Sequence, residues 1–422
     1  MCGGLAERTS DIMSDPYFQR LFADRIGGAN YGKGTEIYKF EKIKRAKRAA
    51  IKDFPDRPLI DFGIGDNDGM AAPVVRQAMK AEVDKLENRG YADNGIAEYK
   101  EAAAEWMKSQ FGVTLDPVAE INHCIGSKTA QAMLPAAFIN PGDITLMTVP
   151  GYPVSGTHTQ YYGGSVFKLP LRRENGFLPD LEAVPEDIRR RAKLLVLNYP
   201  NSPTGALADE AFYRKVVAFA RANDIVVMQD AAHIMLTYGR RPLSFLSVEG
   251  AREVGVELHS MSKGFDMIGW RLGFVAGHER IVRALADIKD NCDSGQFIAI
   301  QKAAVVALRH PEISEAIRAK YERRLHKLVA ALSDLGFDVQ MPGGTYFLYA
   351  PAPKGVAGGP RFASAEECSQ FLIRERSVCT VPWDDAGAYL RFSVTYYAPT
   401  EADEDALMQR LKDRLANDKF IF

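Results

Sequence analysis

The residue of this chain that is best suited to take part in a chemical reaction is a lysine that lies between serine and glycine residues. Ser260-Met261-Ser262-Lys263-Gly264 follows a short apolar run, and Arg271 comes eight residues after the lysine. A lone lysine is usually a solvated surface charge. This one follows a predicted strand, where ligands bind in open α/β sheets. To act as a base near neutral pH, its amine would need a pKa about three units below the ordinary value of about 10.4, which corresponds to about 4 kcal/mol.

Two further polar groups follow predicted strands in the same way. Asp230 ends the run I-V-V-M-Q, and an acid at such a place is commonly a helix cap when it stands alone. Gly126-Ser127 ends the run I-N-H-C-I and begins a predicted helix, an arrangement of donors that suits phosphate. The chain lacks G-x-x-x-x-G-K-[ST], H-E-x-x-H, and a G-x-G-x-x-G after its first predicted strand. Its seven histidines fall singly, so we expect no metal site.

The positions of Ser127, Asp230 and Lys263 depend on the strands and helices that are predicted to alternate between residues 59 and 277. Apolar runs such as L-L-V-L and I-V-V-M are typical of strands that are covered on both faces. The alternation predicts an α/β fold with a mostly parallel sheet flanked by helices. The predicted strands are Leu59–Ile64, Ile121–Ile125, Ile144–Met147, Val166–Leu169, Leu194–Leu197, Ile225–Gln229, Leu258–Ser260 and Phe274–Ala276, and the predicted helices include Val74–Leu86, Thr129–Phe138 and Glu210–Asn223.

The pattern changes after Gly277, where long helices precede short strands, and this order predicts a smaller α+β domain. We therefore expect an N-terminal arm and helix (1–55) that contribute to the small domain, a large domain (56–295), and connecting helices with the small C-terminal domain (296–422). A glycine- and proline-containing stretch at 351–360 is predicted to be a surface loop. The predicted helices are Glu279–Lys289, Gln296–His310, Glu312–Leu335 and Glu401–Leu415, and the predicted strands are Phe337–Gln340, Tyr346–Tyr349 and Leu390–Val394.

The overall composition is that of an ordinary globular protein. Of 422 residues, 53 are Lys or Arg and 54 are Asp or Glu, so the formal net charge of -1 provides no electrostatic case for nucleic acid or an anionic membrane as the partner. The basic run 39–52 has apolar residues at helical spacing and is interpreted as an amphipathic helix. Five scattered cysteines without C-x-x-C spacing, a polar N-terminus and the lack of an apolar run of about 18 residues predict a cytoplasmic protein.

In their order along the chain, these motifs resemble those of the aspartate-aminotransferase superfamily, the fold-type-I pyridoxal-phosphate enzymes. The resemblance covers about residues 35 to 415. It rests on S-x-S-K with Arg271, on Asp230, and on P-G-Y-P (150–153), P-N-S-P-T-G (200–205) and L-R-F-S around Arg391. The fold of that family, a large domain with a mostly parallel sheet plus a smaller α+β domain, agrees with the element pattern.

The resemblance implies a role for each residue around the cofactor, pyridoxal 5′-phosphate. Lys263 resembles the lysine that forms the Schiff base and shuttles the proton, and Asp230 resembles the acid that keeps the pyridine nitrogen protonated. Tyr152 resembles the ring that stacks on the cofactor, although taken alone it could be a buried core aromatic. The implied phosphate-binding residues are Ser127, Ser260, Ser262 and Arg271.

Two more implied roles concern the substrate and a second subunit. Arg391 resembles the arginine that holds the substrate α-carboxylate in a bidentate pair, although alone it could be a surface ion-pair partner. Tyr91, in G-Y-A-D-N-G, resembles the tyrosine that reaches the phosphate from the neighbouring subunit, which implies a homodimer. Taken alone, Tyr91 could be a turn residue beside Gly90 and Gly95.

The chain departs from the family at the residues expected near the 3′ oxygen of the cofactor. The family usually has Asn directly before P-T-G, where this chain has Ser202, with Asn201 one place earlier. It usually has Tyr three residues after the aspartate, where this chain has His233. Both replacements can donate a hydrogen bond, so the chemistry is not excluded, but the pH dependence of the cofactor's imine is expected to differ.

Within the superfamily, the chain resembles the LL-diaminopimelate aminotransferases of lysine biosynthesis. The shared stretches include I-G-S-K, E-N-G-F-L-P-D-L, N-Y-P-N-S-P-T-G-A and H-S-M-S-K. Lys128, in I-G-S-K, is typical of that group and is expected beside cofactor and substrate, and Tyr38 resembles its substrate-contacting tyrosine. Gly65 and Asn201 are also expected at the substrate. A cation with neutral donors suits the distal amino-carboxylate of diaminopimelate and the distal carboxylate of glutamate, the expected amino donor.

The sequence leaves other functions open. Relatives more often have G-D-P-D-x-P where this chain has G-D-N-D-G-M (65–70), and S-K-T-Y-N-M-T-G-W-R where it has S-K-G-F-D-M-I-G-W-R (262–271). Because the first loop is expected at the substrate entrance, another amino acid is an alternative substrate. A carbon–sulfur lyase on the same cofactor is a second alternative. A non-catalytic ligand-sensing module is a remote one, because only a short arm is expected before the fold.

Overall fold

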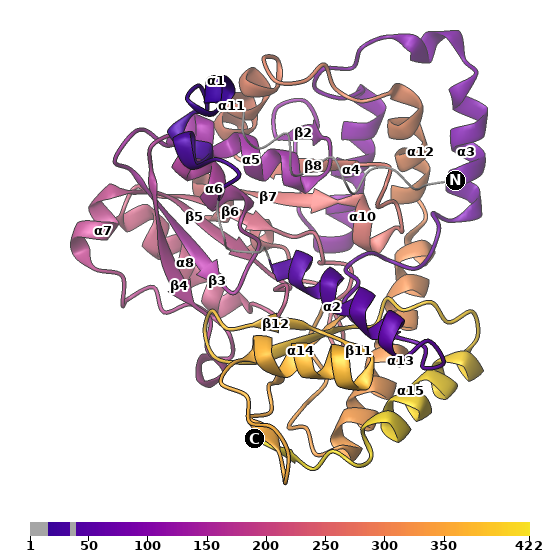
Figure 1. Ribbon diagram of the computed structural model, residues 1–422. Helices are drawn as coiled ribbons and strands as arrows, with labels where there is room; N and C mark the ends of the chain where they lie inside the picture. The colour runs from indigo at the N-terminus through magenta and orange to yellow at the C-terminus, as the bar shows by residue number, and fades with distance from the viewer. Residues whose placement is uncertain (1–15, 34–38) are drawn as a thin grey trace.

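The computed structural model describes residues 16–33 and 39–422, and its largest feature is a seven-stranded sheet (Figure 1). The strand order is β2-β8-β7-β6-β5-β3-β4; β8 runs antiparallel to both its neighbours, and the other adjacent pairs are parallel. The prediction of an α/β fold with a mostly parallel sheet is therefore confirmed. The strands are β2 (Ile121–Cys124), β3 (Ile144–Val149), β4 (Ser165–Pro170), β5 (Ala192–Asn198), β6 (Val226–Asp230), β7 (Gly255–Ser260) and β8 (Gly273–Gly277).

Helices cover both faces of this sheet, as its apolar strands require. β5 is buried at six of its seven positions, so its side chains are enclosed on both faces and show no polar alternation. The helices whose apolar residues pack on one face are α5 (Ser127–Phe138) and α11 (Glu279–Lys289), and those on the other face are α4 (Ala97–Phe111), α8 (Glu210–Ala222) and α12 (Ile298–Leu308).

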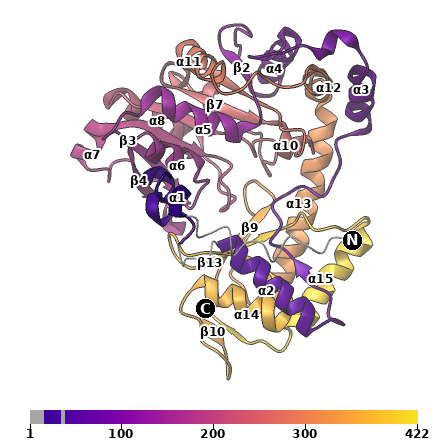
Figure 2. The same ribbon diagram turned by 45° about the horizontal axis from the view of Figure 1, so that its top comes forward.

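A smaller region is built on a three-stranded antiparallel sheet of order β12-β13-β9. Helix α2 packs against α14 and the strands beside it through a cluster that includes Ile43, Ala46 and Ile373. Figures 1 and 2 show this region on the side of the molecule away from α5 and α11, with α13 running from one part to the other. Its elements are α2 (Lys39–Asp53), α13 (Pro311–Asp334), β9 (Phe347–Pro351), α14 (Ala365–Arg376), β12 (Val381–Trp383), β13 (Tyr389–Ser393) and α15 (Glu401–Leu415).

Two short ladders complete the small region: β1 (Ile60–Asp61) is parallel to β11 (Val378–Cys379), and β10 (Gly355–Val356) is antiparallel to β14 (Phe420–Ile421). Within the described ranges, no helix is long and apolar enough to cross a membrane. The remaining helices are α1 (Pro16–Gln19), α3 (Pro73–Val83), α6 (Val154–Tyr161), α7 (Glu186–Arg191), α9 (Ala251–Val254) and α10 (Met261–Gly264).

Three predictions about elements are wrong. The run Leu59–Ile64 contains only the short β1, which pairs with β11 rather than with the large sheet. The strand does not extend to Ile64 because the carbonyl groups of Gly63 and Ile64 accept hydrogen bonds from the side chains of Arg391 and Thr395. Phe337–Gln340 forms no strand; the Phe337 ring packs 5.3 Å from that of Phe420 instead. The stretch 351–360, predicted to be a loop, contains β10.

Candidate active site

Lys263 lies in α10, the one-turn helix that follows β7. Ser260, the last residue of β7, caps this helix by accepting a hydrogen bond from the backbone N–H of Ser262 at 3.2 Å. Lys263 Nζ donates to the carbonyl oxygen of Gly65 at 3.1 Å and lies 5.5 Å from the centroid of the Tyr346 ring. Lys263 follows a strand of the large sheet, but its amine therefore reaches Gly65 and Tyr346, which lie on segments next to strands of the small region.

The surroundings of Lys263 lower the pKa of its amine to about 8. Burial is the largest cause, and the positive charges of Arg271 and Arg391 act in the same direction, while the carboxylates of Asp66 and Asp230 oppose them. This is the direction that an amine needs in order to accept a proton and release it again near neutral pH.

Asp230 ends β6, the strand next to β7, and only 5% of its surface is exposed. Burial raises the pKa of its carboxyl group to about 6, while hydrogen bonds from the Ala232 N–H at 3.1 Å and from Gln131 Nε2 at 2.8 Å oppose this rise. Among the described residues, no cation forms an ion pair with it. A buried acid that is hydrogen-bonded but lacks a cation fits the protonated ring nitrogen of pyridoxal phosphate.

A cradle for an anion lies where α5 begins. Gly126 precedes this helix with a φ of 74°, and Ser127 is the first helical residue. A Cβ at position 126 would overlap the guanidinium of Arg271, so glycine lets this cation approach the N-terminus of the helix. Arg271 also donates to Ser262 Oγ at 3.3 Å. Helix N–H groups, hydroxyl groups and one guanidinium together suit a phosphate dianion.

Arg391, on β13, is a buried cation without an acidic partner within the described part of the chain. It is 7% exposed, its Nη2 donates to the carbonyl oxygen of Gly63 at 3.0 Å, and its guanidinium lies 4.2 Å from the centroid of the Phe347 ring. Its Nε has no hydrogen-bond partner among the described residues. Burial lowers the pKa of the guanidinium to about 10. A buried cation with an unused donor fits a site for a carboxylate ligand.

The segment Gly63-Ile64-Gly65 lies between the two cations. Arg391 binds the carbonyl of Gly63, Thr395 Oγ1 donates to that of Ile64 at 3.2 Å, and Tyr346 OH donates to that of Gly65 at 2.7 Å. Because Gly65 also accepts from Lys263, the amine and the guanidinium reach carbonyl groups two residues apart on one strand of backbone.

His233 is buried against aromatic rings three residues after Asp230. Its ring centroid lies 5.3 Å from that of Tyr346 and 5.9 Å from that of Phe347. Burial lowers the pKa of His233 to about 3, with smaller effects of the same sign from Lys263 and Arg391, so the imidazole is neutral at physiological pH. Its Nδ1 has no hydrogen-bond partner within the described ranges, which leaves a nitrogen available to a ligand.

The P-N-S-P-T-G stretch is tied to the end of β6 by Asn198, a residue that the sequence reasoning missed. Asn198 Nδ2 donates to the Asp230 carbonyl at 3.0 Å, and its Oδ1 accepts from the Ser202 N–H at 2.8 Å. Asn201 is fully buried; its Oδ1 accepts from Thr204 Oγ1 at 2.7 Å, and its Nδ2 lacks a partner among the described residues. Asn198 could have been found from the sequence, because it is a polar residue that directly follows a predicted strand, as Asp230 does.

Gln131 was also missed, although a signal for it existed. It lies four residues after Ser127 on α5, so both side chains are on the same face of that helix. Three further predicted site residues are exposed rather than buried: Tyr91 is 85% exposed, Tyr152 is 42% exposed and Lys128, which directly follows Ser127, is exposed. The described part of the chain gives none of these three side chains a hydrogen bond.

Tyr38 lies outside the described residues. Within the described ranges, no group of three or more His, Cys, Asp or Glu side chains could hold a metal ion.

Comparison with known proteins agrees with this arrangement of residues. Residues 57–411 match the family model of aminotransferase class I and II. An LL-diaminopimelate aminotransferase of Methanocaldococcus jannaschii is 56% identical over 410 residues, covering 95% of this chain and 98% of that protein. The enzyme of the same description from Methanococcus maripaludis is 54% identical over 414 residues, covering 97% of this chain and 100% of that protein.

Solved structures give the same result for the fold. The structure of substrate-bound BacF from Bacillus subtilis superposes with a TM-score of 0.83 at 30% identity, covering 95% of this chain and 98% of that one. A probable N-succinyldiaminopimelate aminotransferase from Thermus thermophilus has a TM-score of 0.79 at 28% identity, covering 90% of this chain and all of that one. The chain therefore belongs to the class I and II aminotransferases, a family of pyridoxal-phosphate-dependent enzymes.

Proposed function

We propose that this chain is an LL-diaminopimelate aminotransferase of lysine biosynthesis, which transfers an amino group between LL-diaminopimelate and the 2-oxoglutarate/glutamate pair. The observation that carries the proposal is the pair of cations on one backbone segment: Lys263 Nζ binds Gly65 and Arg391 binds Gly63. An amine of lowered pKa near a buried guanidinium without an acidic partner suits a substrate with adjacent amino and carboxylate groups. The identity of the substrate rests on the relatives of that description, which match over nearly their whole length.

In this proposal, the residues of the chain divide the work. Arg391 binds the α-carboxylate of the substrate through two charge-assisted hydrogen bonds and so fixes its Cα. Lys263 Nζ takes the proton from that Cα and returns a proton in the opposite half of the reaction. When bound, pyridoxal phosphate supplies the electron sink for the negative charge that develops at Cα. Asp230 holds the proton on the ring nitrogen.

The remaining predicted residues would hold the cofactor and the distal end of the substrate. Lys128 follows Ser127 at the start of α5, where its ammonium group can face a distal carboxylate. Tyr38, Gly65 and Asn201 would contact the substrate. The residues that would hold the cofactor are Ser127, Lys128, Ser260, Ser262 and Arg271 around the phosphate, and Tyr152, Ser202 and His233 around the ring.

We also propose that the enzyme is a cytoplasmic homodimer in which Tyr91 completes the site of the neighbouring subunit. Tyr91 is 85% exposed, and large apolar side chains close to it in sequence or structure, Leu86 and Phe297, are exposed as well. A second copy of the chain that covered these side chains would remove them from water. The three-part division into 1–55, 56–295 and 296–422 belongs to the same proposal.

A half-reaction screen tests the proposed function. Amino acids are added singly to the cofactor-loaded enzyme, and the visible absorbance of the bound cofactor is followed, with Lys263→Ala as the inactive control. LL-diaminopimelate and glutamate are expected to convert the cofactor to its amine form. If both fail while another amino acid reacts, the substrate assignment is wrong. Release of pyruvate from cystathionine would instead indicate a carbon–sulfur lyase.

A further inference from the structure

The loop that follows Gly65 contacts the main chain of Lys263 as well as its amine. Asn67 Nδ2 donates to the Lys263 carbonyl oxygen at 2.8 Å, although the two residues are 196 positions apart. The same amide nitrogen contacts Asp266 Oδ1. Turning the amide over would place its oxygen against two acceptors, so these contacts set the orientation of the Asn67 side chain. Lys263 is thus held at its carbonyl group by Asn67 and at its amine by Gly65.

Asp266 and the loop fit one another at a second point. A Cβ at Gly69 would overlap Asp266 Oδ2, so the carboxylate occupies the space that any other residue at position 69 would need. Asp266 has a φ of 53°, a left-handed conformation that aspartate and asparagine tolerate better than most residues. The stretches G-D-N-D-G-M and K-G-F-D-M, which both depart from the pattern expected from the resemblance, are therefore in contact with each other.

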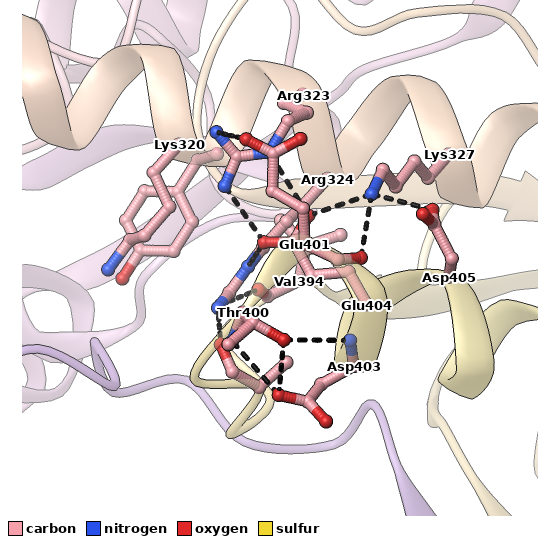
Figure 3. Close-up of polar contacts among 12 residues, drawn as sticks. Lys320, Arg323, Arg324, Lys327, Val394, Thr400, Glu401, Asp403, Glu404 and Asp405 are labelled. Carbon is pink, nitrogen blue, oxygen red and sulfur yellow. Dashed lines mark hydrogen bonds and ion pairs between the residues drawn. The ribbon is translucent and has the colours of Figure 1, made fainter.

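The far end of the loop is anchored to α13. Asp68 accepts hydrogen bonds from Lys320 Nζ at 2.9 Å, Tyr321 OH at 3.0 Å and Arg324 Nη1 at 3.0 Å. Arg324 is buried and also donates to Glu404 Oε1 at 2.8 Å, within the polar network around α13 and α15 in Figure 3. Because Asp68 fixes one end of the loop to this network, the position of the neighbouring Asn67 relative to Lys263 is fixed as well.

We propose that Asn67 is a positioning residue that fixes Lys263 in its reactive geometry, and that Asp266 orients Asn67 for this task. The proposal rests on the assignment of Lys263 as the reacting amine. Without the Asn67 amide, the loop stays anchored through Asp68 and through the Gly65 carbonyl that Tyr346 binds, but the turn that carries Lys263 loses its hydrogen bond to the loop. That turn is then free to move away from the loop, and water reaches the amine that Gly65 now covers. Because burial is the largest cause of the lowered pKa of Lys263, its amine should then titrate at higher pH.

The test measures the titration of Lys263 in the cofactor-free enzyme. The protein is labelled with acetic anhydride at a series of pH values, and the acetylated fraction of the Lys263 peptide is determined by mass spectrometry. In Asn67→Ala, the midpoint is expected to rise by about one unit. Asn67→Ser, which shortens the donor, is expected to shift it in the same direction and replaces Asn67→Ala if that variant yields too little folded protein.

Two further variants exclude other causes of a shift. Asp266→Asn keeps an acceptor for Asn67 and tolerates the same backbone conformation, so its Lys263 titration is expected to match the wild type. The double variant Asn67→Ala/Asp266→Asn leaves no unpaired carboxylate, and it is expected to show the same shift as Asn67→Ala. The matched control is Asn223→Ala, which removes another amide-to-backbone hydrogen bond, to Phe219 at 2.8 Å on α8.

An unchanged Lys263 titration in Asn67→Ala, with lowered thermal stability, would overturn the proposal and leave Asn67 a purely structural role. A shift that disappears in the double variant would also overturn it, because the unpaired charge of Asp266 would then be the cause. Borohydride reduction of the cofactor-loaded wild type tests the proposed function separately. If the cofactor becomes linked to another lysine, the assignment of Lys263 as the reacting amine fails, whereas the titration still shows whether Asn67 controls the surroundings of that amine.

Discussion

Replacing Arg391 by methionine should weaken substrate binding and stabilise the cofactor-free fold. The guanidinium is buried, and the described residues offer it one carbonyl group and one aromatic ring but no carboxylate. Such a residue is retained for its ligand rather than for the fold, because a buried charge without a partner costs free energy. Methionine is unbranched and can keep a favourable sulfur contact with the Phe347 ring.

The magnitude of the stabilisation follows from the titration of Arg391. Burial lowers its pKa from 12.5 to about 10, which corresponds to about 3 kcal/mol at about 1.4 kcal/mol per unit. Since the folded pKa is the lower one, folding disfavours the charged form, and the full penalty is present at any pH below about 10. The lost hydrogen bond to Gly63 offsets about 1 kcal/mol. The net gain of about 2 kcal/mol should raise the Tm of this 422-residue chain by about 2 °C.

The expected loss of activity is much larger. Two charge-assisted hydrogen bonds to the substrate carboxylate, at about 1.5–3 kcal/mol each, correspond to a decrease of kcat/KM by about 10²- to 10⁴-fold. Rapid-mixing absorbance with glutamate measures the loss, and melting of the cofactor-free protein measures the stability. Arg309→Met is the control, because Arg309 is a half-exposed arginine that pairs with Glu105 at 3.3 Å far from the site. A clear decrease of Tm in Arg391→Met, or a kcat/KM within tenfold of the wild type, would refute the reasoning.

Three further substitutions test other parts of the site and fold. Since burial raises the pKa of Asp230 to about 6, its charged form destabilises the cofactor-free fold above that pH; Asp230→Asn should raise the Tm at pH 7.5 by about 1–2 °C and decrease kcat at least about 100-fold, as melting and turnover measurements would show. Ser202→Asn with His233→Tyr should change the pH at which the visible absorbance of the bound cofactor titrates, and an unaltered titration would remove both residues from the 3′ side of the cofactor. Burial opposes the ionisation of Glu404, but hydrogen bonds from arginine and lysine outweigh it and lower its pKa to about 2. Glu404→Gln leaves Arg324 with Asp68 as its remaining acidic partner among the described residues and should cost about 1.5–3 kcal/mol in urea unfolding, whereas a cost below about 0.5 kcal/mol would contradict the importance of the pair.

The strands of the large sheet could be predicted because each is a local apolar run. L-L-V-L forms the centre of β5, and I-V-V-M begins one residue before β6 and continues into it. Both runs are enclosed by helices, so their apolar character is visible in the sequence without knowledge of the strands they pair with. The same reasoning located Lys263, Asp230 and Ser127. β2, β6 and β7 run in the same direction, so the polar residues that follow them lie at the same end of the sheet.

Elements and contacts that depend on distant partners could not be predicted in this way. Leu59–Ile64 has the composition of a strand, but composition does not say that β1 pairs with β11 far along the chain. The contact of Asn67 with Lys263 is of the same kind. It joins a loop before α3 to the helix after β7, and no periodicity of either segment indicates it.

The contacts of the loop at 65–70 change the functional interpretation that its sequence alone would give. Its departure from the family pattern, considered alone, predicts a changed substrate at the entrance of the site. In the structure, Asn67 is engaged by Lys263 and Asp266, and Asp68 is engaged by α13, so neither side chain is free to recognise a different ligand.

Asp266, in the second stretch that departs from the expected pattern, explains why the Asn67 side chain is held in place. Asp266 is the hydrogen-bond partner of Asn67 and fills the space beside Gly69, so the conformations of the two stretches depend on one another. These contacts hold the loop against the segment that contains Lys263, and they argue for retained chemistry rather than for a new substrate. Any difference in specificity should therefore be sought at side chains that the protein leaves exposed, such as Asp66 in this loop and Lys128 at the start of α5.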